Sequence, residues 1–168
     1  MSIAPLLQAD PVIQIHVATA SLALVLGPFA LYLRKRGRLH KTLGYVWVLA
    51  MGITAMSSFG IHSFAVIGPF SPIHLLAVFA LWSIYEAMRH VFAGRIHLHQ
   101  IVMRNLYWRG VIIAGLFNFL PGRLINRMVF EDARALGYVV IALGIGALVA
   151  TALRQRRAPV LPEGQAAT

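Results

Sequence analysis

The sequence predicts an all-α integral membrane protein. The expected fold is a four-helix bundle built from a duplicated helical hairpin, with a fifth transmembrane helix and a short outer interfacial helix. Hydrophobic residues make up 59% of the chain and charged residues 12%, about half the charged share of a soluble domain. Mean hydropathy is +0.74. Because 168 residues leave no room for a separate soluble domain, 1–157 is predicted to be one transmembrane domain and 158–168 a disordered cytoplasmic tail.

Five apolar segments approach the roughly 20 residues that a helix needs to cross a bilayer. Pro11 and Pro72 stand where helices are expected to begin, and a missing N–H is harmless there. Pro28 predicts a kink in the first helix. The fourth segment is the least apolar, since Arg104 and Arg109 lie in its first turns. The predicted helices are 11–33, 42–67, 72–92, 100–120 and 135–153.

The connection at 121–134 predicts a short amphipathic helix in the outer interface. Apolar residues recur there at helical spacing, with polar residues between them. The apolar set is Leu124, Ile125, Met128 and Val129, and the polar set is Arg123, Asn126, Arg127 and Asp132.

Basic residues predict the orientation. All but three of the 15 Lys and Arg residues fall on one side of the predicted helices, and Arg123, Arg127 and Arg134 share a single loop on the other side. The positive-inside rule then predicts an N-terminus outside the membrane and a C-terminus in the cytoplasm. The expected location is a bacterial inner membrane. The net charge of +10 is interpreted as contact with anionic lipid of the cytoplasmic leaflet. Nucleic-acid binding is not expected, because no recognition motif is present. Interfacial anchors are expected at Trp47, Trp82, Tyr107 and Trp108.

The residue types narrow the chemistry. No cysteine is present, which excludes disulfides, thiolate metal sites, iron–sulfur clusters and covalent haem attachment. No nucleophilic triad, P-loop or zinc-protease motif occurs. No basic residue precedes Arg34, so a secretory signal peptide is not evident and the first apolar segment is expected to remain as a helix.

Two parts of the chain resemble each other. Pro, Ile and His at positions 11, 15 and 16 recur at 69, 73 and 74, and Gly-Arg-Leu-His at 37–40 recurs as Gly-Arg-Ile-His at 94–97. Both repeats fall at equivalent points of a helical hairpin. We therefore expect a duplicated hairpin with a pseudo-two-fold axis along the membrane normal.

The seven histidines fall at two predicted levels. Ionisable residues inside a membrane are costly and point to function. Paired imidazoles on neighbouring helices favour b-type haem, with bound quinone as an alternative. The alternative for each histidine is a hydrogen bond between helices, or a side chain that extends to the membrane interface. The outer pair, His16 and His74, is the preferred pair of haem-iron ligands, and His62 could replace either or serve an outer quinol site. The inner set contains His40, His90, His97 and His99, and Arg38, Arg95 and Arg104 could bind haem propionates or lipid.

Glu86 is the only carboxylate inside a predicted span, and Arg89 and His90 share its helix face. One interpretation is a proton relay, or a carboxylate that orients His90. The favoured alternative is an ion pair, within the helix or with Arg109, that lets both charges remain in the membrane.

Two motifs carry a family resemblance. With His16 in the first span, His-Lys-x-x-Gly at 40–44 and His-x-x-x-Met-Arg at 99–104, the chain resembles an uncharacterised family of bacterial multi-pass membrane proteins of unknown function. It departs from the family pattern at Lys41 and Tyr45, where Arg is usual, and at Gln100 and Val102, where Arg and Trp are usual. The resemblance implies that His99, rather than His97, partners His40, and it supplies no activity. The two-level layout also resembles the transmembrane cytochromes of the b561 type.

These observations favour a membrane electron-transfer protein that binds haem b or quinone. The alternative is a non-catalytic accessory or scaffold subunit of a larger membrane complex, or a homo-oligomer. A small-molecule permease is less favoured, because the mid-span residues offer little polarity beyond Thr19, Ser21 and Ser58. Whether the protein is an enzyme is left open.

Overall fold

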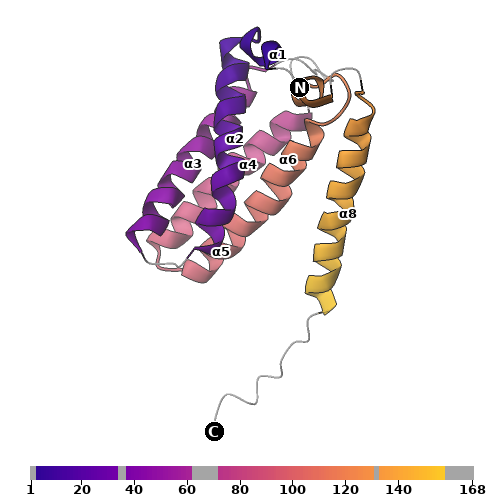
Figure 1. The fold of residues 1–168 in the computed structure, drawn as a ribbon. Helices are drawn as coiled ribbons and strands as arrows, with labels where there is room; N and C mark the ends of the chain where they lie inside the picture. Colours follow the sequence, from indigo (N-terminus) through magenta and orange to yellow (C-terminus); the bar gives the residue numbers. More distant parts are fainter. Residues whose placement is uncertain (1–2, 34–36, 62–71, 131–132, 158–168) are drawn as a thin grey trace.

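The computed structural model describes residues 3–33, 37–61, 72–130 and 133–157, and this part of the chain contains helices and no strand (Figure 1). The fourth predicted helix is observed as three consecutive pieces, α5, η1 and α6, of which η1 is a π-helix. The elements are α1 (Ala4–Leu7), α2 (Pro11–Tyr32), α3 (Arg38–Ser58), α4 (Pro72–Phe92), α5 (Ile96–Asn105), η1 (Leu106–Val111), α6 (Ile112–Phe117), α7 (Leu124–Phe130) and α8 (Leu136–Arg157).

The helix boundaries have local causes. Asp10 caps α2, because its carboxylate accepts a hydrogen bond from the Val12 amide at 2.8 Å, and Pro11 occupies the first helical position. Gly94, at φ +71°, makes the turn between α4 and α5. The second helix begins and ends earlier than predicted, at Arg38 and Ser58, and the rest of its predicted range, from residue 62 on, lies outside the described residues.

Each of the five predicted membrane segments corresponds to a helix or helical run. Within the described ranges, three helical stretches are long and apolar enough to cross a membrane by themselves: Pro11–Tyr32, His74–Phe92 and Leu136–Leu153. Helix α3 and the α5–η1–α6 run have similar lengths but carry Lys or Arg residues, Arg38 and Lys41 in the first turn of α3 and Arg104 and Arg109 within the run. The protein is therefore a multi-pass, all-helical membrane protein, as the sequence predicts.

Helices α2, α3, α4 and the α5–η1–α6 run lie side by side and alternate in direction (Figure 1). The bundle has two ends that differ in charge. At the basic end, α2 and α4 finish while α3 and α5 begin, and it carries Arg38, Lys41, Arg89, Arg95 and Arg104. The opposite end holds the start of α2, the finish of α3 and helix α7. Helix α8 stands apart and contacts α6 and α7.

A packed layer separates the two ends. It consists of Ala23, Gly27, Trp47, Leu106 and Tyr107, all buried. The Trp47 side chain is 2% exposed, and its Nε1–H donates a hydrogen bond to the Ala23 carbonyl at 2.8 Å. The expectation that Trp47 and Tyr107 anchor the interfaces is therefore wrong, because their rings fill the bundle interior. The other two proposed anchors, Trp82 and Trp108, are exposed but lie near the middle of their helical runs, so an interfacial position for them stays a prediction.

Tyr107 also compensates for a proline inside α2. Pro28 has no N–H, so the carbonyl of Leu24, four residues earlier, loses its normal helical donor. The Tyr107 hydroxyl donates to this carbonyl at 3.1 Å. Gly27 lets the ring approach, since a Cβ there would collide with it. The π-helix that carries Tyr107 lies at this crossing, and helix α2 continues through Pro28 to Tyr32.

The connection at 121–134 contains a short helix, as the sequence predicts, but one of its polar residues is buried instead of lying on the polar face. Asn126 is fully buried, although the pattern places it on the polar face. Its Nδ2 donates to the carbonyls of Phe119 at 2.7 Å and Arg134 at 2.9 Å. A Cβ at Gly137 would collide with this cluster. Asn126 therefore joins the end of α6 to the beginning of α8.

Candidate functional site: two histidine-containing cavities

The basic-end cavity has a volume of about 510 Å³ and lies among α2, α3, α4 and α5. His40 and His99 line the same cavity, from the first turns of α3 and α5. These helices are the second members of the two hairpins, but the repeat matches His40 with His97, so the two histidines that line the cavity are not at equivalent positions of the repeat. The other lining residues used below are Lys41, Trp47, Met88, Phe92, Met103 and Arg104.

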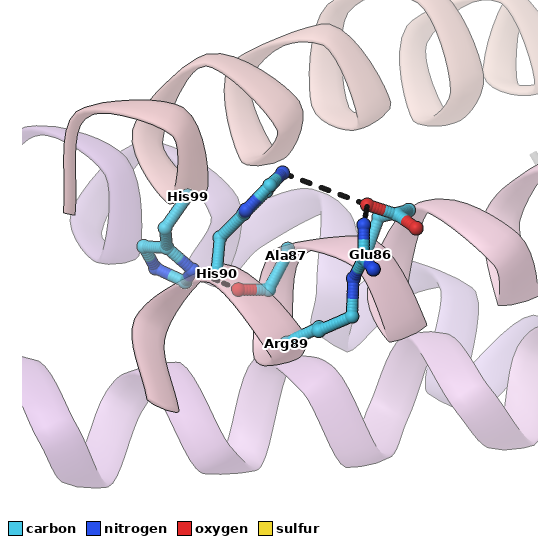
Figure 2. A network of polar contacts seen from close by, with 5 residues as sticks. All are labelled: Glu86, Ala87, Arg89, His90 and His99. Atoms are coloured by element: carbon cyan, nitrogen blue, oxygen red, sulfur yellow. Dashed lines mark hydrogen bonds and ion pairs between the residues drawn. The ribbon is translucent and has the colours of Figure 1, made fainter. Parts of the chain in front are cut away.

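His99 is held by a backbone acceptor. Its Nδ1 lies 2.9 Å from the carbonyl oxygen of Ala87 on α4 (Figure 2). A carbonyl only accepts, so Nδ1 carries the proton and the Nε2 of the neutral ring has a lone pair. His97, two residues earlier, is exposed and does not line the cavity. Of the two alternatives for the inner partner of His40, the structure places His99 in the cavity with it.

Glu86 belongs to a polar network on the same helix as Ala87 (Figure 2). Its carboxylate contacts the Arg89 guanidinium at 3.0 Å and His90 Nε2 at 3.5 Å. Arg109 is exposed, and the structure gives no contact between its side chain and Glu86. Of the two ion pairs considered from the sequence, the observed one lies within α4. Arg89 is 52% exposed, so this pair contributes little to stability.

The three arginines expected at the inner level are separated. Arg104 lines the basic-end cavity, and its guanidinium carbon lies 5.9 Å from the ring centroid of Tyr32. Arg38 and Arg95 are exposed and do not line the cavity. Lys41, which stands where the resembling family usually has Arg, does line it. Among the described residues, Arg104 and Lys41 are thus the Lys and Arg groups that line the cavity and could contact an anionic ligand there.

The opposite-end cavity has a volume of about 320 Å³ and contains His16. The Nδ1 of His16 lies 3.1 Å from the Ser57 hydroxyl. With that hydroxyl donating to the Thr54 carbonyl at 3.0 Å, we assign it as the acceptor of the contact with His16. In the neutral ring, Nδ1 then carries the proton and Nε2 has the lone pair.

His74, the proposed partner of His16, has a packing role. It is 5% exposed, its Nε2 donates to the Ser58 carbonyl at 3.1 Å, and its ring stacks on Phe59 at 5.6 Å between centroids. It is not among the described residues that line the opposite-end cavity. Both histidines are therefore attached to the last turn of α3, but only His16 faces that cavity. His62 lies outside the described residues.

Some groups of these sites were not found from the sequence. Ala87 acts through its backbone carbonyl, which has no residue-type signature. Ser57 belongs to no motif that would single it out, yet its hydroxyl contacts the His16 ring. Across the described ranges, no cluster of three or more His, Cys, Asp or Glu residues could hold a metal ion by itself.

Comparisons with known proteins give a family and no activity. No curated protein and no solved structure gives a significant match to the chain. The family model described as "Predicted membrane protein (DUF2306)" matches residues 13–155, which include both cavities. The chain therefore belongs to this family of predicted membrane proteins of unknown function.

Proposed function

We propose that this protein is a membrane electron-transfer protein that binds b-type haem between His40 and His99 at the basic end. The observation that carries the proposal is that both histidines line one cavity, while the Ala87 carbonyl holds Nδ1 of His99. A histidine that ligates a metal through Nε2 usually donates its other ring N–H to a backbone carbonyl or carboxylate. His99 has this arrangement, because its Nδ1–H donates to the Ala87 carbonyl and its Nε2 is left for a metal.

The cavity suits the group in size and chemistry. Its volume of about 510 Å³ lies within the roughly 300–1,000 Å³ of known cofactor pockets. Trp47, Met88 and Phe92 supply apolar walls, and Met103 completes them on α5. Lys41 and Arg104 supply positive charge for the two propionates. Haem, when bound, supplies reversible one-electron transfer.

The chain's own residues orient the ligand and exchange protons beside it. The Ala87 carbonyl fixes the plane and tautomer of His99. Glu86 contacts His90 and is next to Ala87 in α4. The Glu86–His90 pair therefore lies beside the carbonyl that holds His99. A proton taken up at this pair would offset negative charge gained at the basic-end cavity.

The basic end supports a proposal for orientation as well. Arg38, Arg89 and Arg95 are exposed there, and basic residues flanking helices mark the cytoplasmic side of a bacterial inner membrane. The N-terminus, at the opposite end, would then lie outside, and the exposed arginines would contact anionic lipid. A reporter enzyme that is active only outside the membrane, fused before residue 3 or after residue 157, tests this orientation.

Absorption spectroscopy tests the haem proposal. The full chain is expressed with haem precursor supplied, purified in detergent, and scanned before and after reduction with dithionite. We expect a Soret band that shifts on reduction, with about one haem per chain by pyridine haemochrome assay. A purified, folded protein with no Soret band would overturn the proposal.

A further inference from the structure

The opposite-end cavity has the features of a second binding site, independent of the one at the basic end. It opens between membrane-spanning helices α2, α3, α4 and the η1–α6 run. None of the described residues that line it is Asp, Glu, Lys or Arg. An ionic ligand such as a carboxylate or a phosphate would lose its hydration there without finding a countercharge. The ligand must therefore be neutral and soluble in lipid.

Polar groups stand on two different walls of this cavity. His16, Thr54 and Ser58 line it from α2 and α3, and Asn118 lines it from the end of α6. The remaining walls are small or apolar, among them Ala77, Ala80 and Ala114. An apolar slot with polar groups at two sides fits a flat ring that carries a polar substituent at each end.

His16 determines which kind of polar substituent is accepted. We assign the ring proton to Nδ1, because the Ser57 hydroxyl has the Thr54 carbonyl to donate to and then accepts from Nδ1–H. The nitrogen left for a ligand, Nε2, is therefore an acceptor. A ligand hydroxyl can donate a hydrogen bond to this nitrogen, whereas a ketone oxygen in the same place cannot, because it only accepts. The site thus favours a dihydroxy ring over its oxidised diketone.

We propose that the opposite-end cavity binds a hydroquinone, one ring hydroxyl donating to Nε2 of His16 and the other lying toward Asn118. The proposal concerns binding alone, so it holds whether or not the basic end binds haem. A sterol or an aliphatic alcohol would satisfy only one of the two polar walls.

The test compares two probes on the full-length protein in detergent under argon. Tetramethylhydroquinone is titrated by calorimetry, followed by its dimethyl ether, which keeps the ring but has no hydroxyl to donate. We expect saturable binding of the hydroquinone and at least about tenfold weaker binding of the ether, since one lost hydrogen bond of about 1.4 kcal/mol changes affinity tenfold. Equal binding of the two probes, or no binding of the hydroquinone, would overturn the proposal.

Two substitutions locate the binding. H16L removes the acceptor and should weaken hydroquinone binding at least about tenfold. A114L fills the cavity from the α6 wall and should weaken it comparably even if H16L folds poorly. The matched control is H97L, because His97 is exposed at the other end of the bundle; it should bind like the parent. Unchanged binding in folded H16L and A114L would place the hydroquinone elsewhere and refute the site. Since no haem signal is read, a failure here is distinct from a failure of the haem proposal.

Discussion

The two ends of the bundle hold histidines in different ways. At the opposite end, His16 and His74 both attach to the last turn of α3, one through the Ser57 hydroxyl and the other through the Ser58 carbonyl. At the basic end, His40 and His99 come from different helices and line one cavity. The repeat-related pair, His16 and His74, is thus attached to one helix turn, whereas the two histidines that share a cavity, His40 and His99, are not matched by the repeat. Sequence pairing alone does not distinguish these uses.

The largest expected effect is the loss of haem on removing His99. H99A should lower haem content by more than about tenfold, because losing a ligand costs more than the 10–100-fold loss typical of an outer-shell change. H97A is the matched control and should retain haem, since His97 is exposed two residues away. The pyridine haemochrome assay measures both variants. Haem content in H99A equal to that of H97A and the parent would show that the protein binds haem without His99.

Removing a histidine at the opposite end should lower the stability of the protein and leave its haem content unchanged. H74A removes a buried hydrogen bond to Ser58 and a stacked ring on Phe59. We expect a loss of about 1–3 kcal/mol, seen as a lower midpoint in a thermal scan followed by size-exclusion chromatography, with haem content unchanged. If H74A instead abolished haem binding with the midpoint preserved, the contrast between the two ends would be wrong.

The packed layer between the ends should give an intermediate effect. Y107F removes the donor that compensates for Pro28, leaving the Leu24 carbonyl without it. The expected cost is about 1–2 kcal/mol. Y138F is the control, because Tyr138 is exposed on α8 and should change the thermal midpoint little. Equal midpoints for Y107F and the parent would mean that the carbonyl needs no replacement donor.

The smallest expected effect is at the Glu86 network. E86Q removes an ion pair whose partner Arg89 is half exposed, so the stability should fall by less than about 1 kcal/mol. If the pair exchanges protons beside the haem site, the same variant should flatten the pH dependence of the haem midpoint potential, measured by redox titration. A pH dependence identical to the parent's would restrict Glu86 to a structural ion pair.

The features that depend on the length and hydropathy of a segment could be predicted from the sequence. The helical segments, the alternating bundle and the short helix at 124–130 all follow from apolar periodicity, which the bilayer enforces. The sequence did not predict which polar and aromatic side chains are buried inside the bundle. Asn126 sits between apolar residues in the pattern yet is buried, because two backbone carbonyls need its amide. Trp47 and Tyr107 are buried because Ala23 and Leu24 offer acceptors inside the bundle.

Asn126 has a consequence for the order in which the protein is built. The described residues that line the two cavities all precede it: those of the basic-end cavity finish at Arg104 and those of the opposite-end cavity at Ile125. Helix α8 follows Asn126 and is attached to the bundle through the carbonyls that this amide holds, and through α6 and α7. Both cavities therefore take all their described lining residues from the part of the chain that the ribosome makes before α8.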